Sequence, residues 1–517
     1  MKYHNPVIPG FYPDPSVCRV GADYYLVNSS FEFFPGVPLY HSANLVNWQQ
    51  IGHVLTRQGQ LPLTGCRTSG GIFAPTIRHH NGRFYMITTN VGQPLQNFIV
   101  HTGDIHGPWS DPILLDQMGI DPSLFWDDDG RCYYVGTHNA ADGQCIGQFE
   151  LDPDTGKRLS ETRPIWYGTG GKCPEGPHMY KVNGLYYLMI AEGGTEYGHM
   201  ETIARSDNVW GPFESCPHNP ILTHRNLMPG YEEMCGPGYV DIQGTGHADL
   251  VEDSQGNWWL LFHAVRPTQG QLHHIGRETM LAPVQWVDGW PVVNGGKPIT
   301  AQMCTQDTPG AVPGADGFVP QNPFSVAAAF TQMSRFPADW AHLRNPRPEN
   351  YRFEQGLVLA ACSDDLDSLG SPTFAGVRQR QFDAQVTALL EPSPQEGAQS
   401  GLTVFHTNEQ HYDLLITTQN GQRQVLLRKR VCDMVTETPP VTLPGDGAVR
   451  LQISSTKQGY TFSVSPQGSG PIELGHGRSQ LLSTEVMAGT FTGCFFGVFA
   501  QGAAGSKARF LHFDCRY

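Results

Sequence analysis

Charged residues, long hydrophobic runs and helical patterns are all scarce in this sequence. Asp, Glu, Lys and Arg together make up only 16% of its 517 residues, and the formal net charge is −15. An acidic balance argues against a nucleic-acid surface, and it disfavours anionic substrates and anionic membranes. No apolar run approaches the length of a membrane span, and residues 1–10 lack the apolar core of a signal peptide. We therefore expect a cytoplasmic protein that binds neither nucleic acid nor a membrane.

Paired cysteine motifs are also missing. The chain has 12 cysteines, but no two are spaced as C-x-x-C, and Cys18, Cys132 and Cys494 lie within strand patterns. Without a secretion signal, buried free thiols are favoured over disulfides and zinc ligands. Glycine and proline, by contrast, are abundant, with 59 and 40 residues, and they separate many short strands. This composition predicts an all-β protein.

Five stretches of the chain share one hairpin pattern. Each has an apolar strand, a polar turn that usually contains Asn-Gly or Asp-Gly, and a second strand that opens on paired aromatic residues. The five copies begin, at intervals of about 45–70 residues, at Asp14, Ala74, Asp121, Gly176 and His247. Such turns between apolar strands predict β-hairpins, and five copies at this spacing predict a five-bladed β-propeller.

The composition changes after the fifth copy, which predicts a second domain. Nine of the ten tryptophans lie in the part that holds the five copies, and a Gly/Pro-rich stretch with little periodicity follows it. Short strands of period two then resume, and such strands without helical patterns indicate a β-sandwich. We predict a propeller over residues 1–295, a linker over 296–323 and a β-sandwich domain over 324–517.

The aligned starts of the hairpins would bring several acidic groups to one axis. Asp14 and Asp121 occupy two of these starts, and Glu175 lies one position before a third. An Asp-Pro pair also favours a turn or the entry to a strand, which would explain either aspartate by itself. Turn formation does not easily explain all three carboxylates at matching positions. Buried like charges raise the pKa of one another, which costs free energy, so such a cluster indicates a function.

Two carboxyl groups of different pKa are what the hydrolysis of a glycosidic bond requires. One stays ionised and acts as a general base on water, and the other stays protonated and donates its proton to the leaving oxygen. A third carboxylate nearby can raise the pKa of the acid and orient it. The sequence by itself does not assign these three roles.

An ordered set of motifs resembles glycoside hydrolase family 43, over nearly the whole chain. These motifs are Pro-Gly-Phe-Tyr-Pro-Asp-Pro-Ser at 9–16, Ser-Ser-Phe-Glu-Phe-Phe-Pro-Gly-Val at 29–37, Ser-Gly-Gly-Ile-Phe-Ala-Pro at 69–75, Ile-Asp-Pro-Ser-Leu-Phe at 120–125, Pro-Glu-Gly-Pro-His at 174–178, Ala-Glu-Gly-Gly-Thr at 191–195, Gly-His-Ala at 246–248 and Gly-Arg-Glu-Thr at 276–279. The likeness is greatest to the cytoplasmic β-xylosidases and α-L-arabinofuranosidases that combine a five-bladed propeller with a β-sandwich.

The resemblance implies an inverting mechanism and a role for each carboxylate. Asp14 would be the general base and Glu175 the general acid, and Asp121 would tune the pKa of the acid and orient it. Inversion predicts that the carboxyl groups of the base and the acid lie about 6.5–9.5 Å apart, so that a water molecule fits between them.

The resemblance also implies a set of sugar-binding residues. Arg277 would bind sugar hydroxyls, with an ion pair to Glu278 as the structural alternative. Phe31 and Phe73 would be apolar walls of the pocket, although a single phenylalanine is more often part of a core. Thr195 matches a position that lines the same pocket.

Two further positions carry expectations from the family. His247 would approach the propeller axis and contact a calcium ion, or else only hydrogen-bond the acidic cluster, since calcium prefers oxygen ligands. Phe491, in the run Gly489–Gly493, would close the pocket from the sandwich and leave room for one terminal sugar. The pairs His79–His80 and His273–His274 lack partners at ligand spacing, so we expect them at the surface or in loops.

The expected function is therefore the exo-acting release of terminal xylose from β-1,4-xylo-oligosaccharides. The nearest alternative is an α-L-arabinofuranosidase that removes arabinose side groups, or an enzyme with both activities. A retaining fructosidase has a similar architecture but different motifs, and a propeller that only binds carbohydrate would not need all three carboxylates. We expect xylo-oligosaccharides, plain or decorated with arabinose, as substrates. We expect a homodimer or homotetramer and no organic cofactor.

Overall fold

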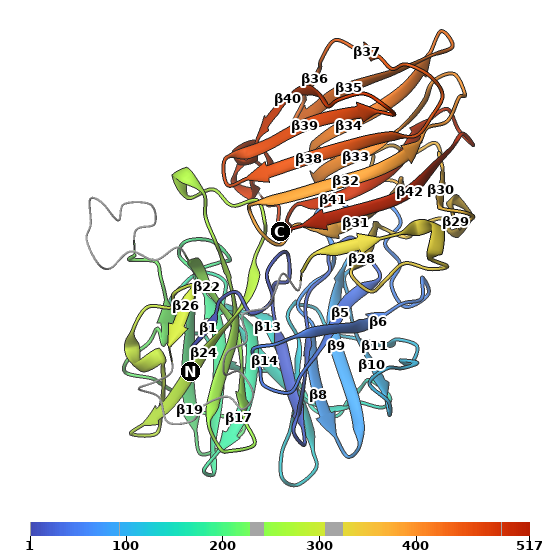
Figure 1. Ribbon diagram of the computed structural model, residues 1–517. Coiled ribbons are helices and arrows are strands. Elements are labelled where there is room, and N and C mark those ends of the chain that lie inside the picture. The colour runs from blue at the N-terminus through green and yellow to red at the C-terminus, as the bar shows by residue number, and fades with distance from the viewer. Residues whose placement is uncertain (1, 93, 228–241, 305–323, 488) are drawn as a thin grey trace.

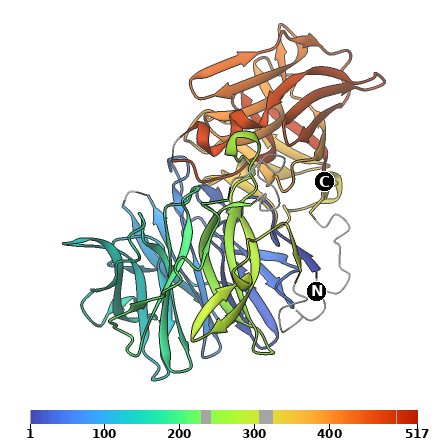
Figure 2. The same ribbon diagram turned by 90° about the vertical axis from the view of Figure 1, so that its left-hand side faces the viewer.

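A computed structural model of the protein describes residues 2–92, 94–227, 242–304, 324–487 and 489–517. Its regular elements are β-strands, with a few short 3₁₀ turns such as Gln269–Gln271 and Ser479–Leu482, and the described residues contain no α-helix. Two domains are evident, a ring of small sheets and a pair of large sheets that lies over one end of the ring (Figures 1 and 2). Within the described ranges, no helix is long and apolar enough to cross a membrane.

The first domain consists of five antiparallel sheets, one for each predicted hairpin. The first blade contains β2 (Ser16–Val20), β3 (Asp23–Val27), β5 (Gly36–Ser42) and β6 (Gln49–Leu55). The second contains β7 (Gly71–Ile72), β8 (Thr76–His80), β9 (Arg83–Val91), β10 (Gln96–Thr102) and β11 (Ile113–Leu115). The third contains β12 (Ser123–Trp126), β13 (Cys132–Ala140), β14 (Gly143–Asp152), β15 (Lys157–Arg158) and β16 (Arg163–Trp166).

The last two blades follow the same plan. The fourth contains β17 (Glu175–Val182), β18 (Leu185–Glu192), β19 (Met200–Ser206), β20 (Glu214–Ser215) and β21 (Leu222–Thr223). The fifth contains β22 (Gln243–Glu252), β23 (Trp258–Val265), β24 (Glu278–Val287) and β25 (Trp290–Val293). The prediction of a five-bladed propeller is confirmed.

The Asn-Gly turns explain why the first two strands of a blade pair in register. Asn81 (φ 49°) and Gly82 (φ 77°) join β8 to β9, and Asn183 (φ 51°) and Gly184 (φ 82°) join β17 to β18. Two consecutive residues with positive φ form the turn whose twist matches that of a two-stranded hairpin. Asparagine and glycine adopt this conformation more readily than other residues do.

The start of the chain fastens the fifth blade. β1 (Lys2–His4) pairs with β26 (Gln302–Cys304), and Ile8 forms a bridge with Thr279 of β24. The Asn5 side chain donates to the carbonyl of Leu281 and accepts from its N–H, at 2.9 Å each. Because the first blade follows directly, these contacts join the first blade to the last.

The second domain is the predicted β-sandwich, and its two antiparallel sheets enclose one hydrophobic core. One sheet has the order β29 (Tyr351–Phe353), β30 (Leu357–Ala360), β42 (Lys507–Arg516), β32 (Ala384–Glu391), β38 (Val449–Thr456), β39 (Gly459–Pro466) and β40 (Ile472–Arg478), with β27 (Val326–Ala328) beside β42. Buried and exposed residues alternate along β32 and β38, as expected when one face packs on a core.

The facing sheet includes a strand from the propeller. Its order is β36 (Met434–Glu437), β35 (Gln422–Val431), β34 (Gln410–Gln419), β33 (Ala398–Thr407), β41 (Phe495–Gly502), β31 (Thr373–Arg378), β28 (Trp340–Leu343) and β4 (Phe33–Phe34), with β37 (Val441–Thr442) beside β35. Because β4 belongs to the connection within the first blade, this sheet runs from one domain into the other.

A cluster of phenylalanines fills the junction of the two domains. Phe33 stacks on Phe495 with ring centroids 4.2 Å apart, and Phe11 lies 6.0 Å from Phe33 and 6.4 Å from Phe495. All three side chains are fully buried. Burial of aromatic surface on this scale fixes the sandwich over the end of the propeller where the inner strands begin.

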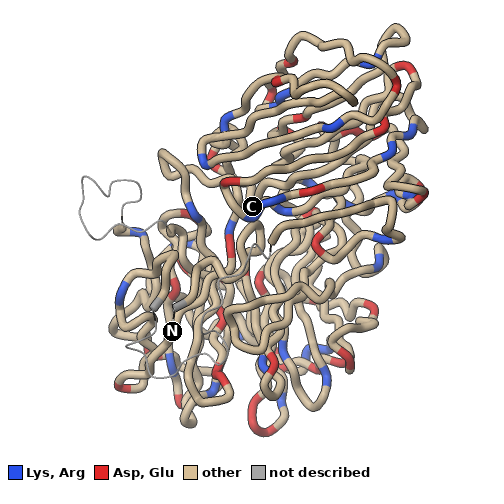
Figure 3. The backbone as a smooth tube through the Cα atoms, in the orientation of Figure 1, with Lys and Arg blue, Asp and Glu red and all other residues tan. Residues whose placement is uncertain are grey.

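Other expectations are met in part. The ten cysteines described are free, and Cys18, Cys132 and Cys494 are buried, as predicted. The domain boundaries stay predictions, and residues 305–323 of the predicted linker lie outside the described residues. Acidic and basic residues are interspersed over both domains (Figure 3).

Candidate active site

Four of the five aligned hairpin starts share an unusual backbone conformation. Asp14 (φ 53°), Asp121 (54°), Gly176 (58°) and His247 (51°) are all left-handed, whereas Ala74 does not have a positive φ. Residues other than glycine seldom adopt this conformation, and its cost in free energy is tolerated mainly at functional sites. The chain therefore makes the same turn into the inner strand of four blades.

Asp14 is buried, with 4% of its surface exposed, and both carboxylate oxygens have partners. Oδ2 accepts a hydrogen bond from the Ser29 hydroxyl (2.5 Å), and Oδ1 accepts one from Nη1 of Arg277 (2.7 Å). Nδ1 of His263 lies 3.0 Å from Oδ1, and Nδ1 of His247 lies 3.6 Å from it. Burial opposes ionisation, but Arg277 and then the two histidines outweigh it and hold the pKa of Asp14 well below its usual range.

Glu175 lies at a bulge in the fourth blade, one residue before the aligned position. Glu175 pairs with Ala191, and the next pair is His178 with Met189. The step is therefore three residues along β17 but only two along β18, which is the bulge. A bulge re-aims a side chain and is common beside active sites. Burial, followed by the negative charge of Asp14, raises the pKa of Glu175 to about 7.

Asp121 is 6% exposed, whereas Glu175 is half-buried. Burial raises the pKa of Asp121 well above its usual range, and the charges of Glu175 and Asp14 raise it further. Two carboxyl groups linked in this way titrate as a pair, so the proton belongs to the pair and not to one residue. The site therefore combines an Asp14 that favours the ionised form with a pair that holds a proton more readily than ordinary carboxyl groups do.

Arg277 bonds to Asp14 and not to its neighbour in sequence. Its Nη1 also donates to Oγ1 of Thr195 (3.1 Å). Glu278 pairs instead with Arg266, at 2.6 Å between Nε and Oε2. The structural alternative, an ion pair of Arg277 with Glu278, is therefore wrong, and Arg277 links the first blade to the loop after β18.

Two phenylalanines from distant parts of the chain, Phe31 and Phe491, lie over the guanidinium of Arg277, and a third, Phe73, packs against both rings. The ring of Phe31 lies 5.1 Å from that of Phe73 and 6.1 Å from that of Phe491. Arg277 lies 5.7 Å from the ring of Phe31 and 5.8 Å from that of Phe491, within the range of cation–π attraction. Phe31 is only 2% exposed, while Phe73 and Phe491 are half-buried and keep more surface for a ligand.

The sandwich loop around Phe491 is hydrogen-bonded to the propeller. The N–H of Phe491 donates to the Ser69 hydroxyl (2.9 Å), and the N–H of Cys494 donates to the carbonyl of His274 (2.8 Å). His274 lies three residues before Arg277, so the sandwich holds the segment that leads into the guanidinium.

The pair His273–His274 lies in the loop between η1 (Gln269–Gln271) and β24, as expected, but this loop is covered by the sandwich. His274 is fully buried, and Nδ1 of His273 lies 2.6 Å from Oε1 of Glu485 in the sandwich. Gly493 packs so closely on this segment that a Cβ atom would lie 2.0 Å from the carbonyl oxygen of Ile275. The sequence predicted the loop but did not show that residues from another part of the chain cover it.

Asp14, His247 and His263 form a geometrically possible metal site, with one donor atom of each within 4.8 Å of the others. The donor set does not fit the predicted calcium. Calcium takes about six to eight oxygen ligands, whereas two of these three donors are nitrogens. The carboxylate oxygen is also bonded to Arg277 at 2.7 Å, so a divalent cation would meet a fixed positive charge.

The sequence prediction missed two direct partners of Asp14. His263 lies on β23, where it pairs with Gly246, the residue before His247. Ser29 follows the second strand of the first blade, at the same end of the propeller. The hairpin alignment considered only the first strand of each blade, and the second strand of the fifth blade carried the missing signal.

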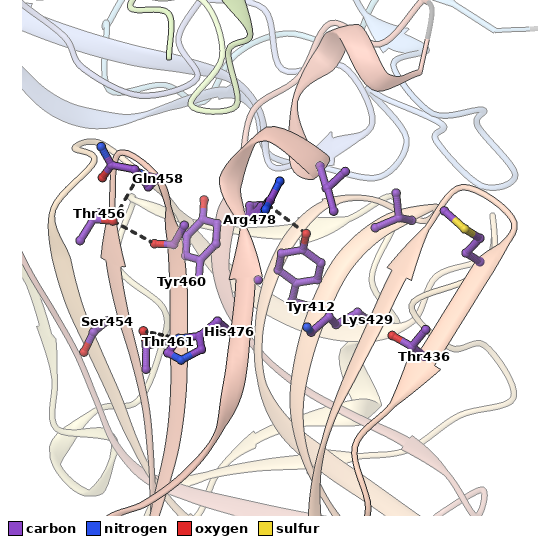
Figure 4. Close-up of a pocket in the computed structure, with 15 residues that line it drawn as sticks. Tyr412, Lys429, Thr436, Ser454, Thr456, Gln458, Tyr460, Thr461, His476 and Arg478 are labelled. Atoms are coloured by element: carbon purple, nitrogen blue, oxygen red, sulfur yellow. Dashed lines mark hydrogen bonds between the residues drawn. The ribbon is translucent and has the colours of Figure 1, made fainter. Parts of the chain in front are cut away.

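The cavities of the molecule do not by themselves locate this site. A cavity of about 660 Å³ lies in the sandwich between β34, β35 and β36 on one side and β38, β39 and β40 on the other (Figure 4). None of the predicted site residues lines it. We therefore place the candidate active site by its carboxylates and their charges and not by the volume of a cavity.

Two family descriptions match most of the chain. The description "Glycosyl hydrolases family 43" matches residues 3–291, and "Beta xylosidase C-terminal Concanavalin A-like domain" matches residues 329–516. The two regions coincide with the strands of the propeller and with those of the sandwich.

Similar proteins span the full chain. A protein of Bacteroides ovatus named "non-reducing end alpha-L-arabinofuranosidase" is 39% identical over 99% of this chain and 94% of its own length. A "xylosidase/arabinosidase" of Butyrivibrio fibrisolvens is 41% identical over 81% of each chain. A solved structure of a Bacteroides ovatus "Xyloglucan PUL GH43B" protein superimposes with a TM-score of 0.90 at 39% identity and covers 100% of both chains.

These matches extend over the propeller and the sandwich alike, and the first family description covers the region that contains Asp14, Glu175 and Arg277. The chain belongs to glycoside hydrolase family 43.

Proposed function

We propose that this protein is an exo-acting, inverting glycosidase that releases terminal pentoses, either xylose from β-1,4-xylo-oligosaccharides or arabinose from side groups. The observation that carries the proposal is the buried ion pair of Asp14 with Arg277, 2.7 Å apart, beside two carboxyl groups, Asp121 and Glu175, for which the described residues provide no ion-pair partner within 4.0 Å. Asp14 therefore favours ionisation and the pair favours protonation, as general base and general acid catalysis in a single step needs. Membership of family 43 supports the same reaction.

In this proposal Asp14 activates the attacking water. It is ionised, and it accepts hydrogen bonds from Ser29 and Arg277 that fix its orientation. Glu175 donates the proton to the leaving oxygen, because it is the more exposed member of the protonated pair. Asp121 shares the proton with Glu175 and so keeps the pair protonated near neutral pH.

The pocket that receives the sugar combines one cation with aromatic walls. Arg277 and Thr195 would bind the hydroxyls, and Phe73 and Phe491 would pack against the ring. Phe31 would support both aromatic walls from behind, since it is almost fully buried. The contribution of Phe491 from the sandwich supports a closed pocket that admits only the end of a chain.

The choice between the two pentoses rests on the relatives. The 39% identical protein of Bacteroides ovatus is named an arabinofuranosidase, and the 41% identical protein of Butyrivibrio fibrisolvens is named for both activities. These names favour arabinose release as the second candidate activity beside the xylose release predicted from the motifs.

Three further expectations accompany the proposal. We propose a cytoplasmic location and a homodimer or homotetramer, both on the strength of the family resemblance alone. Calcium contact by His247 rests on the family resemblance alone, because two of the three nearby donors are nitrogens, and no catalytic step depends on it.

A product assay tests the function directly. Xylobiose, xylotriose and an arabinose-decorated xylo-oligosaccharide are offered to the protein, and the first sugar released is followed by proton NMR. We expect single pentoses of inverted anomeric configuration, because water attacks from the face opposite the leaving group. Release of sugar with retained configuration, or binding of the oligosaccharides without hydrolysis, would contradict the proposal.

Substitution of the two principal carboxylates tests their roles. Asp14→Asn and Glu175→Gln should each lower kcat/KM on xylobiose or the decorated oligosaccharide by about 10²–10⁴-fold, the usual contribution of a general base or acid. Asp288→Asn is a matched control, because Asp288 is exposed and has φ 51°, close to the 53° of Asp14. A folded variant of either principal residue with wild-type activity would refute its assignment.

The pH profile of kcat/KM follows from the pKa shifts. Asp14 must be ionised and its pKa is lowered, so activity persists well into the acid range. Glu175 must be protonated and its pKa is raised to about 7, so activity falls as the pH rises through about 7. In Glu175→Gln, assayed with an activated aryl pentoside, this basic limb should vanish. A limb that persists in the variant would belong to another group.

A further inference from the structure

We propose that His263 is a positioning residue that sets the orientation and the charge state of Asp14, a role that rests on the proposed function. His263 lies in the middle strand of the fifth blade, where it pairs with Gly246 on one side and Thr279 on the other. Its side chain is completely buried. A histidine in this position must satisfy both ring nitrogens inside the protein.

The partners of His263 complete a closed ring of four side chains. Nδ1 lies 3.0 Å from Oδ1 of Asp14, and Nε2 lies 3.3 Å from Oγ1 of Thr195. Nη1 of Arg277 lies 3.1 Å from the same Thr195 oxygen and 2.7 Å from the same Asp14 oxygen. The ring thus joins the general base to both groups that would bind the sugar.

The contact with Asp14 selects one arrangement of protons. An ionised Asp14 can only accept, so the proton of the neutral imidazole lies on Nδ1 and points to Asp14. Nε2 then accepts from the Thr195 hydroxyl, which in turn accepts from Arg277. The opposite tautomer would place two lone pairs 3.0 Å apart in a buried site.

One contact competes with this arrangement. The N–H of Asp14 donates toward Nδ1 at 3.2 Å, which would need a lone pair there, but the contact of Nδ1 with the ionised carboxylate is shorter, 3.0 Å, and a charge-assisted hydrogen bond is the stronger of the two. Burial, followed by the charge of Arg277, keeps the pKa of His263 well below its usual value. The imidazole rings of His199 and His247 lie 4.9 and 5.6 Å from that of His263, measured between ring centroids. Burial lowers the pKa of both of these neighbouring histidines.

Two substitutions separate positioning from simple packing. His263→Leu fills the space without a donor, and His263→Asn keeps a side-chain N–H near the place of Nδ1. We expect His263→Leu to lower kcat/KM about ten- to a hundredfold, as loss of a hydrogen bond to a charged group does. The acid limb of its pH profile should move to higher pH, because the ionised form of Asp14 loses a donor. In His263→Asn the limb should return toward that of the wild type.

The outcomes distinguish this inference from the proposed function. If the wild-type protein has no glycosidase activity, the proposed function itself is wrong. An active wild type with a folded His263→Leu variant that keeps its acid limb and its kcat/KM within about twofold overturns only the role of His263. Loss of wild-type activity in EDTA and its recovery with a divalent cation would also overturn that role, because His263 would then be a metal ligand.

A second observation, independent of the active site, concerns the cavity in the sandwich (Figure 4). Its floor includes the rings of Tyr412 and Tyr460, which are 0% and 2% exposed, and it lies between β40 and β36, each at the edge of its sheet. Its volume of about 660 Å³ falls within the range of small-molecule sites.

The charge of this cavity is opposite to that of the protein. Lys429 and Arg478 line it, no acidic residue does, and the whole chain has a net charge of −15. Among the described residues, neither cation has an ion-pair partner within 4.0 Å. One acidic group, Glu473, contacts the lining, since its Oε1 lies 3.1 Å from Nε2 of His476.

Hydroxyl groups complete the lining. Thr436, Ser454, Thr456 and Thr461 all contribute to it, together with the amide of Gln458. Hydroxyls and amides bind polyols, and unpaired cations bind a carboxylate. We infer that the cavity binds a saccharide that carries a carboxylate, such as a xylo-oligosaccharide substituted with a uronic acid.

Calorimetric titration of the full-length Glu175→Gln protein tests this second site without turnover. We expect the uronate-substituted xylo-oligosaccharide to bind at a site that the unsubstituted one does not occupy. Lys429→Ala combined with Arg478→Ala should weaken this binding at least about tenfold, while Lys507→Ala, an exposed lysine on β42, should not change it. Equal binding of both oligosaccharides, no effect of the double variant, or equally tight binding of inorganic phosphate would overturn the inference.

Discussion

The buried contact between Asp14 and Arg277 is the interaction on which the site depends. Three carboxyl groups lie near one axis, and burial opposes the ionisation of each of them. One guanidinium, 2.7 Å from a single carboxylate oxygen, decides which group is ionised. The other two share a proton more readily than ordinary carboxyl groups do, because burial and the charge of Asp14 oppose their ionisation. The chemical asymmetry of the site therefore begins with one ion pair.

The propeller provides this asymmetry through local departures from its own repeat. The left-handed turn recurs at the entrance to four blades, so the backbone presents different side chains in equivalent places. In the fourth blade the bulge moves the functional residue from Gly176 to Glu175. In the fifth blade the second strand also contributes, through His263. A repeated scaffold with altered registers thus produces a site without symmetry.

The sandwich contributes to the site as well as to the stability of the fold. Its loop brings Phe491 to the aromatic wall and bonds to the segment that ends at Arg277. Strand β4 and the phenylalanine cluster at the junction hold that loop in place from the propeller side. The guanidinium of Arg277 determines the ionisation of Asp14. Packing between the domains can therefore influence the catalytic carboxylate through a chain of two or three residues.

The sequence by itself determined the strands, the five hairpins and the identity of Asp14, Asp121 and Glu175, because alternation and turn residues are local properties of the chain. It also pointed to Arg277 and Phe491 through motifs. Tertiary structure alone decided that Arg277 bonds Asp14 and not Glu278, that His263 closes a ring with Thr195, and that His274 is buried. These features join residues far apart in the chain, and pKa values depend on burial and neighbouring charge. Neither can be read from local spacing.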